Sequence, residues 1–141
     1  MVGDTSRCPS DVIFVLDESN SVNMEDFDRM KSFVSHLVSR MDVNSENTRV
    51  GLVCFSNNVT EAFNLITHAS VASIISAITS LNFTGGYTYT SLALRHVREN
   101  MLTPAAGDRD DVPNVVIILT DGKSIIPDET EVCTHAGIIV F

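Results

Sequence analysis

The sequence predicts an α/β fold with a Rossmann-like open sheet, which is mostly parallel, has one antiparallel edge strand and carries helices on both faces. Continuous apolar runs alternate along the chain with stretches in which apolar residues recur at three- and four-residue spacing. Such runs are typical of strands buried on both faces of a parallel sheet, and the spaced residues are typical of amphipathic helices. Apolar residues make up 44% of the 141 residues, which is enough for the buried core of one domain.

The parallel strands are predicted from four continuous apolar runs. These runs cover residues 12–16, 50–55, 115–119 and 137–141. The turn-like segment Ser56-Asn57-Asn58 separates the second run from residues 59–65. That short stretch is close enough in sequence to pair back as an antiparallel edge hairpin.

Helices are predicted between these strands. The helical patterns cover residues 27–41, 71–81 and 94–101, and residues 127–135 allow a further short helix. Asn23 is a candidate N-cap of the first helix, with Glu25 and Asp26 favourably placed in its first turn. The pair Gly85-Gly86 breaks the chain ahead of the third helix, so we expect a loop there.

The chain is predicted to contain a short linker followed by one domain. Residues 1–10 form the expected N-terminal linker, and residues 11–141 form the expected domain. The chain ends within its fourth apolar run. We therefore expect this domain to be C-terminally truncated.

Charge and cysteine content narrow the classes of function. The formal net charge is −9, from 9 basic and 18 acidic residues, and no basic stripe is present. This makes nucleic acid and anionic membrane surfaces poor partners. No apolar run approaches the roughly 18 residues of a membrane span, so membrane insertion is not expected. The sequence has no C-x-x-C pair, which disfavours a cysteine-based zinc or redox site, and Cys54 is expected to be a small buried apolar residue.

Three polar clusters each follow or precede a predicted element. Residues 17–21 follow the first strand, residues 85–90 precede the third helix, and residues 120–124 follow the third apolar run. Ligands of open α/β sheets bind beyond the carboxyl ends of the strands. We therefore expect the three clusters to meet at that edge of the sheet.

The chemistry of these clusters favours a hard divalent cation. They offer carboxylates and hydroxyls, and they contain no thiolate or imidazole. Such oxygen ligands suit Mg²⁺ or Mn²⁺ better than zinc. A metal held directly by neutral hydroxyls keeps most of its positive charge, so it stays attractive to an incoming anion.

The three motifs together resemble a known adhesion site. The D-x-S-x-S pattern at Asp17, Ser19 and Ser21, the GGxTxT string at residues 85–90 and the TDG string at residues 120–122 are similar to the metal-ion-dependent adhesion site of von Willebrand factor type A domains. Within this family, the chain most resembles the domains of the extracellular matrix, or collagen-like, group. The resemblance covers roughly residues 10 to 141.

This resemblance implies a set of metal ligands, although the sequence departs from the family's pattern in two respects. Ser19, Ser21 and Thr88 would ligate the metal directly, Asp17 and Asp121 would act mainly through waters, and a partner's glutamate or aspartate would complete the shell. Glu18 and Asn20 stand where the family often has small residues or glycine. By the same resemblance, we expect the family's last strand and C-terminal helix to be missing from this chain.

The expected function is that of an adhesion module and not of an enzyme. The module would be secreted and would capture a carboxylate of an extracellular protein, such as collagen or another matrix component. Tyr87, Tyr89 and Glu18 are candidate partner-binding residues, because they flank the predicted metal site. Asn58 and Asn82 begin glycosylation sequons. The resemblance also implies a disulfide from Cys8 to a cysteine beyond residue 141.

Alternative readings of the same residues stay open at this stage. One is a structural matrix module that binds its partner without metal. Another is a magnesium-dependent phosphatase of the haloacid-dehalogenase type, because the buried strand that ends at Asp17 resembles the start of such an enzyme. That chemistry uses a second acidic residue two positions further on, where this chain has Ser19. The Asp17–Ser21 cluster could form only a strand-end turn, and Thr88 could be a helix N-cap. Thr90 is expected to serve in capping or packing.

Overall fold

The computed structural model describes residues 9–120 and the backbone of residues 136–140. Its five strands form one sheet in the order β3-β2-β1-β4-β5, and all neighbours are parallel except the β2–β3 pair. The strands are β1 (Ser10–Asp17), β2 (Thr48–Phe55), β3 (Val59–Phe63), β4 (Asn114–Leu119) and β5 (Ala136–Val140). The predicted sheet, with its antiparallel edge strand, is confirmed.

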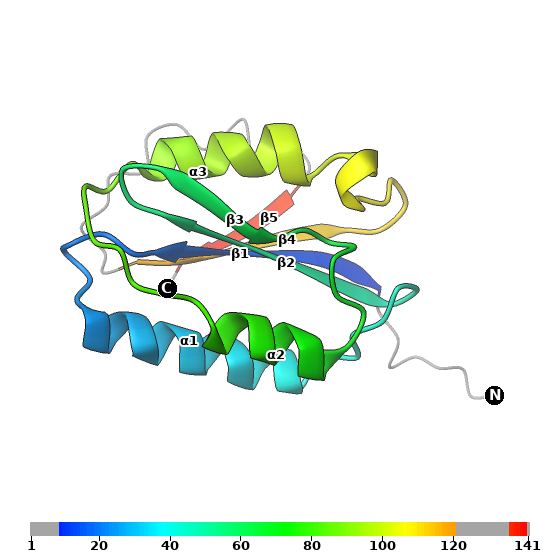
Figure 1. Ribbon diagram of the computed structural model, residues 1–141. Helices are drawn as coiled ribbons and strands as arrows, with labels where there is room; N and C mark the ends of the chain where they lie inside the picture. Colours follow the sequence, from blue (N-terminus) through cyan, green and yellow to red (C-terminus); the bar gives the residue numbers. More distant parts are fainter. Residues whose placement is uncertain (1–8, 121–135, 141) are drawn as a thin grey trace.

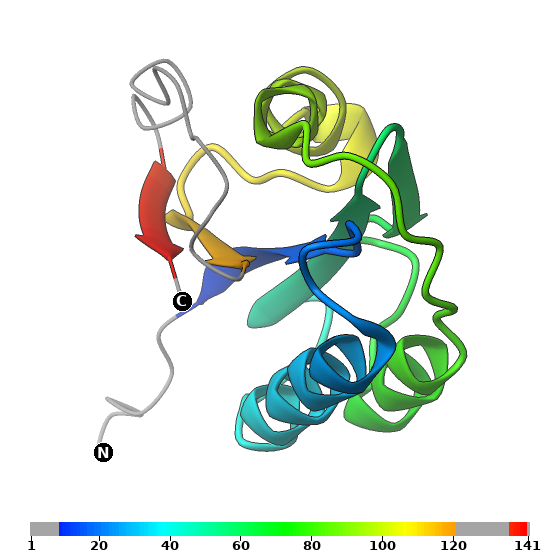
Figure 2. The ribbon, with the colours of Figure 1, turned by 90° about the vertical axis from the view of Figure 1, so that its left-hand side faces the viewer.

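Helices cover both faces of this sheet, as Figures 1 and 2 show. The helices α1 (Met24–Ser39) and α2 (Val71–Thr79) pack side by side on one face. The opposite face carries α3 (Thr90–His96), which continues as a π-helical turn (Val97–Met101) and is followed by a 3₁₀ turn (Pro104–Ala106). The short helix predicted at residues 127–135 lies outside the described residues. No helix in the described part of the chain has the length and apolar character needed to cross a membrane.

The third predicted helix is present as α3, which begins at Thr90. In the sequence this helix is marked by Leu94, Val97 and Met101, which are large apolar residues. Thr90 and Ala93 are small but buried, so they belong to the face that packs on the sheet. A pattern of large apolar residues alone does not detect a first turn built from small ones.

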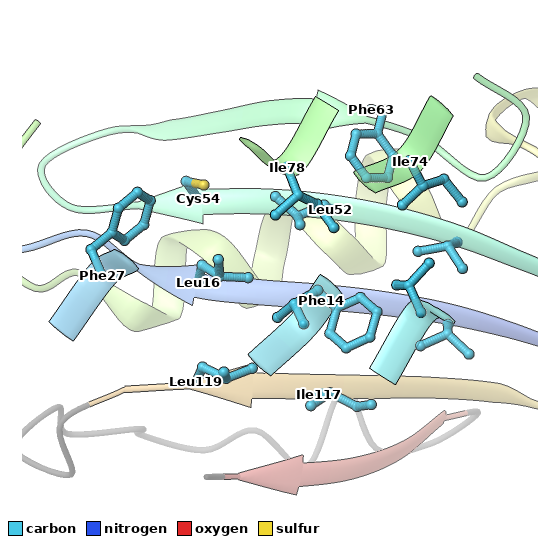
Figure 3. Packing of buried hydrophobic residues seen from close by; sticks show 14 of the residues in the cluster. Phe14, Leu16, Phe27, Leu52, Cys54, Phe63, Ile74, Ile78, Ile117 and Leu119 are labelled. Atoms are coloured by element: carbon cyan, nitrogen blue, oxygen red, sulfur yellow. The ribbon is translucent and has the colours of Figure 1, made fainter. Parts of the chain in front are cut away.

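The core consists of two layers because each parallel strand is buried on both sides. Alternate residues of β1 point to opposite faces, with Phe14 and Leu16 under α1 and α2, and Ile13 and Val15 under α3. Figure 3 shows the first of these layers. Cys54 belongs to the same layer and is buried, as predicted.

The register of the sheet decides where the polar clusters lie. Asp17 at the end of β1 is level with Phe55 at the end of β2. Leu16 is level with Leu119 at the end of β4. The three segments that follow these strands therefore start from one edge of the sheet.

Candidate metal-binding site

Asp17 is the last residue of β1 and is fully buried. Its Oδ1 accepts a hydrogen bond from the backbone N–H of Ser19 at 2.9 Å. Its Oδ2 accepts one from the hydroxyl of Thr120, just beyond β4, also at 2.9 Å. The carboxylate thus joins the first and third polar clusters. The strand-end turn considered above is also present, through the hydrogen bond from Ser19.

The Ser19 and Ser21 hydroxyls form a pair beside this carboxylate. Their Oγ atoms lie 2.9 Å apart, Ser19 being buried and Ser21 exposed. Adjacent ligands of an octahedral Mg²⁺, each about 2.1 Å from the ion, are separated by about 3 Å. The spacing of the two hydroxyls therefore fits two neighbouring corners of such a shell.

The segment of residues 83–89, hereafter the glycine loop, lies against this cluster. The backbone N–H of Asn20 donates to the carbonyl of Gly86 at 2.8 Å. On the other side, the N–H of Tyr89 donates to the carbonyl of Ser56 at 3.3 Å. The structure thus brings the second cluster, with the half-buried Thr88, to the edge that carries Asp17.

Glu18 does not lie where a partner could reach it. Its side chain is only 4% exposed and hydrogen-bonds to both the hydroxyl and the backbone of Thr84. Burial raises the pKa of Glu18, Thr84 lowers it, and the charge of Asp17 raises it further. The prediction of a partner contact at Glu18 is corrected here, because its carboxylate is buried against the glycine loop.

Tyr87 and Tyr89 are the exposed aromatic side chains of the glycine loop. They are 70% and 48% exposed, and their ring centroids lie 6.0 Å apart. The N-cap position of α3 belongs to Tyr89, so the cap reading of Thr88 is wrong. Thr90 is packed in the first turn, and its Oγ1 is buried with no hydrogen-bond partner among the described residues.

One contact of the glycine loop was missed in the sequence. Asn57, in the turn between β2 and β3, accepts a hydrogen bond from the N–H of Tyr87 at 2.6 Å. The string Ser56-Asn57-Asn58 indicates a turn, but nothing in it signals a partner 30 residues away. Asp121, the remaining predicted ligand, lies outside the described residues.

Comparison with known proteins decides the family. A family model described as the von Willebrand factor type A domain matches residues 11–141. This chain belongs to the von Willebrand factor type A domain family. The Rossmann-like sheet and the order of the three motifs agree with that membership.

Relatives of this type A domain include collagen chains and a matrilin. It is 35% identical over 137 residues to the mouse collagen alpha-4(VI) chain, covering 94% of this chain and 6% of that protein. It is 36% identical over 138 residues to mouse matrilin-1, covering 94% of this chain and 28% of that protein. The chain thus spans under a third of the length of either relative. Neither relative is named as an enzyme.

Solved structures give the same fold. Proximal thread matrix protein 1 from the mussel byssus matches with a TM-score of 0.86 and 30% identity, over 95% of this chain and 38% of that chain. A second structure of that protein matches with a TM-score of 0.85 and has a zinc-occupied MIDAS motif, that is, a metal-ion-dependent adhesion site with zinc bound. A divalent metal thus occupies the adhesion motif of a structural neighbour.

Proposed function

We propose that this type A domain is an extracellular adhesion module that holds a divalent metal beyond the carboxyl ends of β1 and β4 and captures a carboxylate of a partner. The observation that carries the proposal is the Ser19–Ser21 hydroxyl pair, 2.9 Å apart, beside the buried carboxylate of Asp17. Mg²⁺ or Mn²⁺ suits this set of hard oxygen atoms.

The ligands have separate roles in the proposed site. Ser19, Ser21 and Thr88 contact the metal directly, and Asp17 and Asp121 hold metal-bound waters. Bound there, the metal supplies a positive charge that attracts a carboxylate. Neutral hydroxyls leave most of that charge in place, and the buried Asp17 keeps the Ser19 backbone oriented through its 2.9 Å hydrogen bond.

The partner in this proposal is an extracellular protein, such as collagen or another matrix component. Support comes from the collagen and matrilin relatives and from the exposed tyrosine pair beside the site. Tyr87 and Tyr89 offer large aromatic surface at low conformational cost, a property of residues that dominate binding interfaces. A glutamate or aspartate of the partner would reach the metal while apolar groups next to it pack on these rings.

Secretion and glycosylation belong to the same proposal. Asn58 and Asn82 are both exposed, as an attached glycan requires. Asn58 directly follows Asn57, which contacts the glycine loop. A glycan at Asn58 would therefore stand beside the metal face.

The test is binding to a defined panel of immobilised collagens and matrilin-1 in Mg²⁺, in Mn²⁺ and in EDTA. We expect binding in metal that falls at least about tenfold in Asp17→Ala, as is typical when a residue that supports a metal site is replaced. Binding should also fall in EDTA, because EDTA removes the metal. Asp28→Ala, which changes an exposed carboxylate on α1, is the matched control and should bind normally. Binding that persists in both EDTA and Asp17→Ala would instead establish a metal-independent matrix module.

A further inference from the structure

The glycine loop is fixed from two sides by segments far away in the sequence. One side is the Asp17–Ser21 cluster, through the hydrogen bond from Asn20 to the Gly86 carbonyl at 2.8 Å. The other side is the turn between β2 and β3, which receives two N–H groups of the loop. Thr88 stands between those two N–H groups in the chain.

Asn57 supplies the shorter of the two contacts with the turn. Its Oδ1 accepts the N–H of Tyr87 at 2.6 Å, whereas the carbonyl of Ser56 accepts the N–H of Tyr89 at 3.3 Å. The Asn57 contact comes from a side chain, so a substitution removes it without altering the backbone. Asn57 is not among the residues that the adhesion motifs contain.

The glycine loop also leaves no room beside Asn57. Gly86 has a φ of +116°, and a Cβ atom built on it would lie 3.0 Å from Oδ1 and 3.1 Å from Cγ of Asn57. The neighbouring Gly85 has a φ of +74°, and a Cβ there would lie 2.5 Å from Oδ1 of Asn20. The two glycines therefore let two asparagine side chains approach the loop backbone closely.

We propose that Asn57 is a positioning residue for the metal site, which holds the glycine loop so that the Thr88 hydroxyl faces the Ser19–Ser21 pair. The inference rests on the proposed function, because Thr88 is taken there as a metal ligand. Asn57 acts through the backbone of Tyr87 and does not touch the metal. Residues that orient ligands in this indirect way change metal affinity about 10- to 100-fold when they are replaced.

The experiment compares Asn57→Ala with Asn57→Asp and Asn58→Ala in the 141-residue chain. Asn57→Asp keeps an oxygen acceptor at the same position, and Asn58→Ala changes an adjacent exposed residue of the same turn. Two quantities are measured, namely the Mn²⁺ dissociation constant by calorimetry and the hydrogen-exchange rate of the Tyr87 amide in EDTA. Thermal melts in EDTA verify that each variant is folded.

We expect Asn57→Ala to bind Mn²⁺ about tenfold more weakly, at the lower end of the range for outer-shell residues. Its Tyr87 amide should exchange faster than in the unmodified chain. Asn57→Asp should restore both values, because it still accepts the Tyr87 N–H, and Asn58→Ala should leave both unchanged. The melts in EDTA separate positioning from a general loss of stability, because they compare the stability of the variants without metal.

Two results would overturn the inference and can be told apart from failure of the proposed function. Normal Mn²⁺ affinity in a folded Asn57→Ala would show that this contact does not position a ligand. Equal weakening in Asn57→Ala and Asn57→Asp would show that the acceptor oxygen is not what matters. An unmodified chain that binds no Mn²⁺ would instead overturn the proposed function itself, and the effect on metal affinity with it.

Discussion

The carboxylates of Asp17 and Asp108 lie at opposite ends of the sheet and have different surroundings. Asp17, at the carboxyl end of β1, accepts hydrogen bonds from Ser19 and Thr120. Asp108, in the segment before β4, is partly buried, and its Oδ1 has no hydrogen-bond partner among the described residues. Burial and then the charge of Asp11 raise the pKa of Asp108, and a hydrogen bond to Asn114 offsets part of this.

The raised pKa of Asp108 predicts a pH-dependent effect of Asp108→Asn. Protonation of Asp108 favours the folded state, so its stabilising effect is complete below about pH 4 and is lost as the pH rises through the folded-state pKa. Asparagine cannot ionise. The free energy of unfolding of Asp108→Asn, relative to the unmodified chain, should therefore increase between about pH 4 and pH 7.

Urea unfolding of both proteins over this pH range measures the difference directly. Each midpoint is converted to a free energy with the slope of its own transition. A difference that stays flat or shrinks as the pH rises would show that Asp108 carries no destabilising charge in the folded protein.

At the scale of single residues, the sequence predicted which side chains of the candidate site lie together, because this depends on their type and spacing. Asp17, Ser19 and Ser21 lie in one short motif, and the structure holds their polar atoms within hydrogen-bond distance. Asn57 and Glu18 were harder, because their roles depend on contacts with the glycine loop. Residue type gave no sign that Glu18 would turn inward.

Between elements, Arg109 connects several segments at the end of the sheet opposite the candidate metal site. Its guanidinium forms an ion pair with the fully buried Asp11 of β1 at 2.6 Å. It also donates to the backbone carbonyls of Ser10, Glu46 and Asn47. One side chain thus ties the start of β1 to the turn before β2 and to the segment leading into β4.

This arrangement predicts a large loss of stability in Arg109→Ala. Removing one partner leaves Asp11 as an unpaired buried charge, which typically costs about 3–5 kcal/mol. Arg95→Ala removes an exposed arginine of α3 and should change stability by less than about 0.5 kcal/mol. Equilibrium urea unfolding of the two variants is the measurement, and similar stabilities would contradict the role assigned to Arg109.

The elements themselves were predictable where a local signal is strong. The continuous apolar runs gave the strands of the sheet, and Asn23 caps α1 as expected, accepting the N–H of Asp26 at 2.9 Å. The exact start of α3 at Thr90 could not be predicted, because its first turn contains small residues. The π-helical turn that follows, Val97–Met101, has no recognised signal in the sequence.

In the whole molecule, parallel topology is what brings distant motifs together. The strands β1, β2 and β4 all end at the same edge, so the segments after Asp17, Phe55 and Leu119 start side by side. This general consequence could be predicted from the alternation of strands and helices. The contacts that then fix the glycine loop depend on how the loops pack, and the strand pattern does not specify them.

The central claim is that a divalent metal binds the folded domain at Asp17, Ser19 and Ser21. The most direct measurement is the thermal unfolding of the chain in EDTA and in Mg²⁺ or Mn²⁺, alongside Asp17→Ala. Metal at about 100-fold above its dissociation constant should stabilise the unmodified chain by about 2.7 kcal/mol, seen as a higher melting temperature. Asp17→Ala should show no such rise. A cooperative melt of the unmodified chain that is the same in saturating metal and in EDTA would contradict the claim.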